Sequence, residues 1–312
     1  MTNIDIHYIN LDRSSDRRAK VEQSFAESKF SSRWTLTRFA AVDATSPPVL
    51  AALGNLNGAY KGNFLSHLGC LRRQVDTDSH LYIAEDDIQF CDKTGPLLEK
   101  VIDALGEDTW DIIHPEVSLM SAVEFPRFYK LRRNTTFRNK VRLIALGDFP
   151  YAYAGSGSYI VNRKSKRKFL EGLDETVAHA GGKLDVPFDL CLRGLLHYHT
   201  LKGFVTVPFL TAPSIHADES SAPYGKEDPN LDRVKRLHLE LINAYRRLVW
   251  VGFDPEKVMP PELRSEGENI FLLTEQDKLF QKVISWLLFM QYEARYREYD
   301  LLRFLEEEVP IV

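Results

Sequence analysis

Three consecutive carboxylates, Glu85, Asp86 and Asp87, are the residues of this sequence best suited to chemistry. They directly follow the short apolar segment 81–84, which predicts a buried strand. Adjacent carboxylates repel one another and are costly to bury, so a divalent cation would relieve the repulsion. Carboxylate oxygens suit Mg²⁺ or Mn²⁺, which commonly share their coordination with phosphate groups. The alternative is an acidic loop in solvent, with one carboxylate capping the next helix.

Two further carboxylates, Asp185 and Asp189, lie on either side of Pro187, a residue that suits the first turn of a helix. Helix amides would favour Asp189 as an anion, and Asp185 would lie on the preceding loop. A substrate hydroxyl does not ionise alone at neutral pH, and a positioned carboxylate that takes its proton in the transition state accelerates a reaction by ~10²–10⁴-fold. We expect Asp189 first, and Asp185 second, as the catalytic base. The alternative is that both only cap the helix.

The elements that must position these residues alternate along the chain. We expect strands at 4–9, 36–40, 81–84, 110–113, 151–161 and 204–207. We expect helices at 14–28, 63–75 and 96–105 and from 162 onward, with a loop at 45–59. This alternation predicts an α/β fold in which helices flank a mainly parallel sheet. Ligands of such sheets lie beyond the carboxyl ends of the strands, where the acidic triplet falls.

The character of the sequence changes after Pro223. Residues 232–250 and 275–308 have apolar residues at helical spacing and hardly any strand pattern. We therefore expect a domain at 1–222 and a helical C-terminal extension at 223–312. The extension could contact a membrane, form a homodimer or cap an acceptor cleft.

Composition limits the classes of function. The 312 residues are 44% apolar and 27% charged, which is typical of a folded globular protein. A net charge of −4 argues against bulk nucleic-acid binding. Three scattered cysteines and no visible signal peptide favour a reducing compartment. We expect a cytoplasmic protein, with contact to the inner face of a membrane left open.

Five segments, taken together and in this order, resemble glycosyltransferase family 25. They are YINLDRSSDRR, RFAAVDA, GNFLSHLGCLRR, LYIAEDDIQF and AGSGSYIVNRKS. The family includes bacterial lipopolysaccharide sugar transferases and collagen galactosyltransferases, and the resemblance covers roughly residues 4–221. It implies a GT-A-like fold, a UDP-sugar donor, inversion at the anomeric carbon, and Mn²⁺ (or Mg²⁺) as cofactor.

The resemblance also implies roles for individual residues. Donor-binding residues would be Asn10, Leu11, Arg13, Arg17, His67, Glu85, Asp86, Gly155 and Ser156, and metal ligands would be Asp87, Glu85 and His216. Neutral imidazole is a good Mn²⁺ ligand, and glycine lets the backbone approach a donor closely. A histidine satisfied by packing is the alternative for His67, and a surface-loop histidine is the alternative for His216.

We therefore predict a metal-dependent hexosyltransferase that acts on a hydroxyl of a cell-surface glycan or glycolipid. A second hypothesis is a non-catalytic, transferase-like module that binds a glycan or a partner through its helical extension. A third is a nucleotidyltransferase, which would release pyrophosphate rather than UDP.

Overall fold

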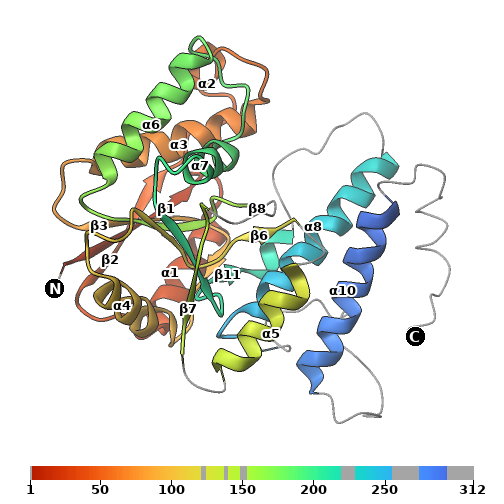
Figure 1. Ribbon diagram of the computed structural model, residues 1–312. Coiled ribbons are helices and arrows are strands. Elements are labelled where there is room, and N and C mark those ends of the chain that lie inside the picture. The colour runs from red at the N-terminus through yellow and green to blue at the C-terminus, as the bar shows by residue number, and fades with distance from the viewer. Residues whose placement is uncertain are drawn as a thin grey trace.

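The computed structural model describes residues 2–120, 124–136, 140–147, 153–218, 229–254 and 274–293. Its centre is a seven-stranded sheet with helices on either side (Figure 1). In order across the sheet, the strands are β2 (Trp34–Ala40), β1 (Ile4–Asn10), β3 (His80–Glu85), β9 (Ser158–Val161), β5 (Ile112–His114), β10 (Gly203–Val207) and β7 (Arg142–Ala145).

Most strands of this sheet run in one direction. β1 pairs in parallel with β2 and β3, and β5 pairs in parallel with β10, whereas β9 and β7 run the opposite way. β1 and β3 are buried along nearly their whole length, as expected of parallel strands covered on both faces. The predicted α/β architecture with a mainly parallel sheet is confirmed.

Helices cover both faces of the sheet (Figure 1). α3 (Gly58–Gln74), α6 (Lys166–His179) and α7 (Phe188–His197) pack against one another on one face. α1 (Ser15–Glu27) and α4 (Thr94–Leu105) lie on the other face. The expected helices at 14–28, 63–75 and 96–105 are confirmed, and the helix expected from 162 begins at Lys166.

The expected loop at 45–59 is wrong in part. It contains α2 (Pro47–Ala51), whose prolines occupy its first turn, where they leave no intrahelical bond unmade. α3 begins within the same segment, because the side chain of Asn57 accepts a hydrogen bond from the backbone N–H of Tyr60 and caps the helix.

The single strand expected at 151–161 is also wrong. Its described part forms β8 (Tyr153–Ala154) and β9, separated by residues 155–157, and residues 151–152 lie outside the described part. Gly155 has φ +120°, which ends the extended run. Two small sheets accompany the large one: β8 pairs with β6 (Ser118–Leu119), and β4 (Ile88–Gln89) pairs with β11 (Ala212–Pro213). The chain therefore forms a strand beyond 207, which we did not expect.

The C-terminal segment is helical where the structure describes it. α8 (Pro229–Val249) packs against α5 (Glu124–Thr136) and α10 (Glu275–Glu293), and the remainder of the helix expected at 275–308 lies outside the described residues. Tyr245 and Leu248 of α8 belong to the same apolar core as the sheet. Backbone bonds from Phe209 to Val249 and from Val251 to Phe209 join the end of α8 to the segment after β10. The division at 222 stays a prediction, but α8 shares the core of the sheet.

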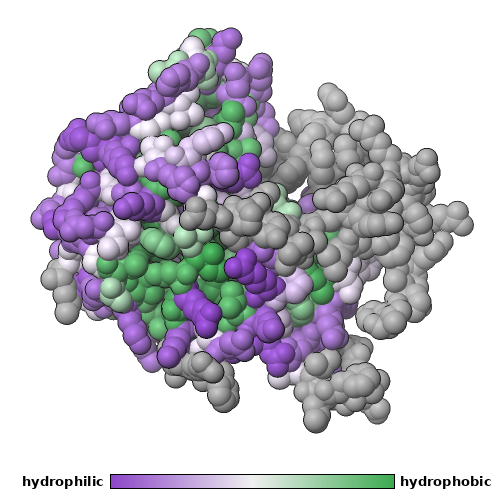
Figure 2. All heavy atoms as spheres, viewed as in Figure 1, coloured by the Kyte–Doolittle hydropathy of each residue, from purple (hydrophilic) through white to green (hydrophobic). Residues whose placement is uncertain are grey.

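One face of the molecule shows apolar side chains around β7, between α4 and α5 (Figure 2). β7 is an edge strand of four residues, and Arg142 at its start is exposed. A short edge strand that begins with an exposed charge is a poor template for pairing with another sheet. None of the described helices has the length and apolar character needed to span a bilayer.

Candidate functional site

A cavity of about 540 Å³ lies at the carboxyl ends of β1 and β3. Loops after β1, β2 and β3 line it, together with the starts of α3 and α7, the 155–157 loop and one residue of α8. This is the sheet edge at which open α/β sheets bind ligands. The predicted site residues that line it are Leu11, Arg13, Arg17, Glu85, Asp86, Asp87, Gly155, Ser156 and Asp189.

Glu85, the last residue of β3, is held in place by neutral and aromatic partners. Its carboxylate accepts hydrogen bonds from Asn63 (3.2 Å) and Ser156 (3.0 Å), and Nε2 of His67 lies 3.4 Å away. Burial alone would raise the pKa of Glu85, but these partners lower it to about 2. Glu85 is therefore a fixed negative charge, and all three of these contacts are made to its Oε1.

His67 lies behind Glu85 rather than in the cavity. Its ring is fully buried, stacks on Phe188 at 4.3 Å between ring centroids, and places Nδ1 3.0 Å from the Tyr159 hydroxyl. The structure thus places His67 where it orients Glu85. The predicted role of His67 in donor binding would therefore be indirect, through the carboxylate of Glu85.

Asp86 is oriented by residues from β1 and α1. Asn10 donates to one carboxylate oxygen at 2.7 Å and Arg17 donates to the other at 3.2 Å. Asn10 is itself held by Arg38, which donates to its side-chain oxygen at 3.0 Å. Asn10 is buried and does not line the cavity, so it acts on a donor only through Asp86.

Asp87 has a different environment. Burial, and then repulsion from Glu85 and Asp86, raise its pKa to about 7. Among the described residues, no hydrogen bond to its carboxylate is present, while Asp86 and Glu85 each have several. Asp87 is therefore the carboxylate of the triplet whose charge most needs a cation.

The predicted three-residue metal shell is not assembled. Within the described part of the chain, no group of three or more His, Cys, Asp or Glu side chains is arranged to hold a metal ion. His216, on the short 3₁₀ helix Ile215–Asp218, does not line the cavity, and its backbone oxygen accepts a bond from Arg17 at 3.3 Å. Mg²⁺ and Mn²⁺ often bind through one or two carboxylates plus substrate phosphates. The residues present fit a metal that enters with a diphosphate and binds Asp87.

The two base candidates are placed differently. Asp189, in the first turn of α7, lines the cavity, and the backbone N–H of Gly155 points to its Oδ2 at 3.4 Å. Burial raises the pKa of Asp189 above its ordinary value. Asp185 is exposed, does not line the cavity, and accepts a bond from the backbone N–H of Asn55 at 2.7 Å. Of the two candidates, only Asp189 lines the cavity.

Arg13 and Leu11 lie at the mouth formed by the loop after β1. Arg13 is mostly exposed and forms an ion pair with Asp43, so its guanidinium is available to a phosphate only in competition with that carboxylate.

Sequence reasoning missed Arg246 of α8, which lines the cavity, and its buried partner Glu116. Burial opposes the charge of Arg246, but Glu116 keeps its pKa above the ordinary value. The arginine falls in the segment that we expected to be a separate extension. The only sequence sign of Glu116 was its place three residues after the strand expected at 110–113.

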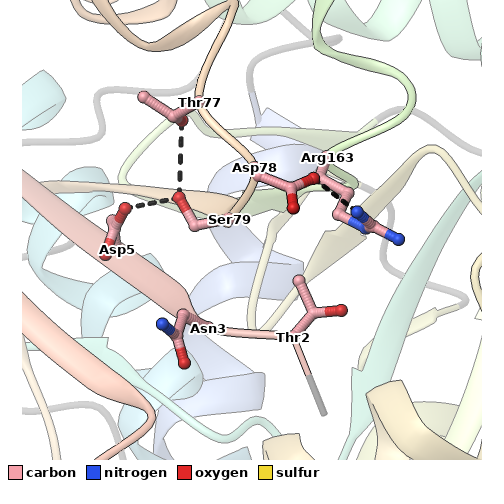
Figure 3. Close-up of a pocket in the computed structure, with 7 residues that line it drawn as sticks. All are labelled: Thr2, Asn3, Asp5, Thr77, Asp78, Ser79 and Arg163. Carbon is pink, nitrogen blue, oxygen red and sulfur yellow. Dashed lines mark hydrogen bonds and ion pairs between the residues drawn. The ribbon is translucent and has the colours of Figure 1, made fainter.

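A second pocket, of about 460 Å³, lies at the opposite edge of the sheet, where β1 begins (Figure 3). Its charged and polar side chains are paired with one another: Asp78 with Arg163, and Ser79 with Asp5 and Thr77. This pairing leaves little charge free for a ligand, in contrast to the cavity at Asp87.

The comparisons agree with the resemblance of the five segments. The family model described as glycosyltransferase family 25 (LPS biosynthesis protein) matches residues 3–191, more than half of the chain. The chain belongs to glycosyltransferase family 25. The family match ends before α8, and it is shorter than the stretch of 4–221 over which we expected it. No protein with a curated description matches the chain.

Similar solved structures are distant glycosyltransferases. The glycosyltransferase GlyE of Streptococcus pneumoniae TIGR4 is 10% identical, with a TM-score of 0.35; the match covers 63% of this chain and 44% of GlyE. The galactosyltransferase LgtC, in complex with donor and acceptor sugar analogues, is 17% identical over 73% of this chain and 81% of LgtC (TM-score 0.35). Mouse xyloside xylosyltransferase 1 is 11% identical over 64% of this chain and 83% of that one (TM-score 0.37).

Proposed function

We propose that this family 25 protein is a metal-dependent glycosyltransferase that moves a hexose from a UDP-sugar to a hydroxyl of a cell-surface glycan or glycolipid. The observation that carries the proposal is the meeting of Asp87 and Asp189 in one cavity, at the edge of the sheet where ligands bind. The family membership supports a sugar donor and an acceptor as the substrates.

Asp189 supplies the base. Burial raises the pKa of Asp189 above its ordinary value, and a carboxylate with a higher pKa is a stronger base. It takes the proton of the acceptor hydroxyl as the new bond to the anomeric carbon forms. The bond from that carbon to the diphosphate breaks in the same step, so we propose a single displacement with inversion.

The donor is held by other residues that line the same cavity. Asp86, fixed by Asn10 and Arg17, presents its carboxylate to the donor ribose or sugar. Ser156 and Gly155 bring backbone and hydroxyl groups close to the donor. A bound Mn²⁺ or Mg²⁺ at Asp87 would neutralise the charge that develops on the departing diphosphate, so no general acid is needed.

Incubation of the purified protein with a panel of UDP-sugars tests the proposal. We expect UDP release that requires Mn²⁺ or Mg²⁺ and is lost in Asp189→Asn, while Asp185→Asn stays active. With an acceptor in hand, the anomeric configuration of the product reports inversion directly.

The competing hypotheses give different results in the same experiment. A rise in melting temperature with UDP and Mn²⁺ but no turnover, across the panel and in the presence of acceptors, favours the non-catalytic binding module. Release of pyrophosphate from UTP and a sugar phosphate favours the nucleotidyltransferase. Neither binding nor turnover with any UDP-sugar contradicts the proposal. The predicted cytoplasmic location, membrane contact and homodimer gain no support from the described residues and remain predictions.

A further inference from the structure

Arg246 enters the cavity from outside the segment that matches the family. It lies in the last turn of α8, where the helix dipole favours a cation, and the family match ends at residue 191. Arg246 lies 57 residues beyond Asp189, the cavity-lining residue that precedes it in the chain. The cavity is therefore completed by a part of the chain that lies outside the segment matched by the family model.

Two neighbours hold the guanidinium of Arg246 rigidly. Glu116 accepts bonds from Nε (2.6 Å) and Nη2 (2.7 Å), and Asn243 accepts one from Nη1 (2.8 Å). Glu116 is 1% exposed and Arg246 is 8% exposed. A guanidinium has five N–H donors. These bonds use three of them, which leaves one N–H on Nη1 and one on Nη2 without an acceptor among the described residues.

The position of these free donors is informative. A Cβ added to Gly157 would lie 3.6 Å from Nη2 of Arg246 and 3.5 Å from Oε1 of Glu116, so the guanidinium lies against the glycine loop. Asp87 and Glu85 are close enough to act electrostatically on Arg246. A more than nine-tenths buried arginine with unused donors, facing a cavity, is costly unless a ligand accepts from it.

We propose that Arg246 forms an oxyanion subsite of the cavity and donates to the diphosphate of the donor. This inference rests on the proposed function. A diphosphate can accept from both Nη atoms at once and still reach a metal at Asp87. Glu116 does not cancel this role: it fixes the direction of the fork and keeps the arginine from pairing with Asp87.

The order of the chain around Glu116 suits this role. β5 ends at His114, and the backbone oxygen of Pro115 accepts bonds from Leu210 N–H and the Thr206 hydroxyl. The backbone beside Glu116 is thereby tied to β10, so Glu116 is a rigid anchor. Arg246 acquires the same rigidity through its two bonds to that carboxylate.

Binding of inorganic pyrophosphate and of UDP, each with Mn²⁺, tests the subsite by titration calorimetry. We expect Arg246→Lys to weaken both by roughly 10-fold or more, because lysine keeps the charge but lacks the planar fork. Arg132→Lys is the matched control: Arg132 is also 8% exposed but lies on α5 and does not line the cavity. Its substitution should leave both affinities unchanged.

Folding and function are separated by a second variant. Replacing both partners, in Glu116→Leu/Arg246→Met, removes the buried pair without leaving a lone charge. We expect this double variant to melt as a folded protein and still to bind pyrophosphate weakly.

Wild-type affinity in Arg246→Lys or in the folded double variant overturns the subsite, even if UDP-sugar turnover upholds the proposed function. Arg246-dependent pyrophosphate binding without UDP binding supports the subsite and contradicts the UDP-sugar function. Absence of binding of either probe to the wild type overturns both.

Discussion

His114, at the end of the central strand β5, should make the protein sensitive to acid. Its side chain is 1% exposed, and neither ring nitrogen has a hydrogen-bond partner among the described residues. Burial lowers its pKa from 6.5 to about 3. Because the folded-state pKa is the lower one, the unfolded chain binds more protons between these values. Stability is therefore present at neutral pH and falls as the pH drops through 6.5 toward about 3.

The size of the effect follows from these two pKa values. At about pH 4.5, protonation of this histidine stabilises the unfolded chain by about 3 kcal/mol and the folded chain by almost nothing. At about pH 7 the same effect is close to zero. His114 therefore removes about 2–3 kcal/mol of stability between these conditions.

We expect the His114→Leu variant to lack this acid-dependent loss of folding stability. Leucine buries no polar atom, so the variant should be at least as stable at neutral pH, since two unpaired nitrogens are removed. Urea unfolding of both proteins at the two pH values measures the difference. His80, whose pKa is lowered to about 4 chiefly by burial, is present in both proteins and cancels. His197→Asn, at an exposed position, is the control. Equal acid sensitivity in wild type and His114→Leu would refute the reasoning.

The remaining predictions concern the cavity. Asp189→Asn should lower kcat by ~10²–10⁴-fold with unchanged UDP affinity. The acidic limb of the pH profile of kcat/KM should vanish in this variant, and in the wild type it should lie above the ordinary pKa of aspartate because Asp189 is buried. An effect of equal size in Asp185→Asn would contradict this. Asp87→Asn should abolish the Mn²⁺-dependent part of UDP binding in calorimetry. It should raise the melting temperature without metal, because it relieves repulsion from Glu85 and Asp86. A variant that binds UDP and Mn²⁺ like the wild type would contradict the metal role of Asp87. Gly155→Ala should destabilise the chain by about 1–3 kcal/mol, because φ +120° strains a residue with a side chain. The control Gly194→Ala, in helix α7 with no atom within 4 Å of the added Cβ, should be neutral or stabilising. Equal melting temperatures of the two variants would contradict the backbone strain at residue 155.

Much of the fold could be predicted because it depends on local patterns. The apolar runs at 4–9 and 81–84 became β1 and β3, and the polar residues that follow each run meet at one edge of the sheet. Because these two strands pair in parallel, the residues at their ends lie at one edge of the sheet, as the βαβ pattern predicts. At that edge, Nδ2 of Asn10 donates to Oδ2 of Asp86 at 2.7 Å. The same logic failed for residues 155–157, since a backbone turn at positive φ leaves no periodicity to detect.

The direction in which a side chain points could not be predicted, and this decides the roles within the site. Glu85, Asp86 and Asp87 are identical in kind from sequence. In the structure, His67 and Ser156 contact the first, Asn10 and Arg17 contact the second, and the carboxylate of the third accepts no hydrogen bond from the described residues. Each of these partners comes from another part of the chain. A triplet that looked like a shared metal site is thus divided into an anchored charge, an oriented carboxylate and a single metal-binding candidate.

The pairing of Glu116 with Arg246 shows why the contribution of α8 to the cavity could not be predicted. The two residues are 130 positions apart, and neither belongs to a recognisable motif. Helical spacing in α8 correctly predicted a helix, but amphipathic spacing reports only that one face is buried, not against which surface. The two hydrogen bonds from Arg246 to the 1% exposed Glu116 tie the end of α8 to the segment that follows β5. The docking of α8 therefore also brings Arg246 to the cavity, and a chain truncated before α8 would expose Glu116 and lack this cavity-lining arginine.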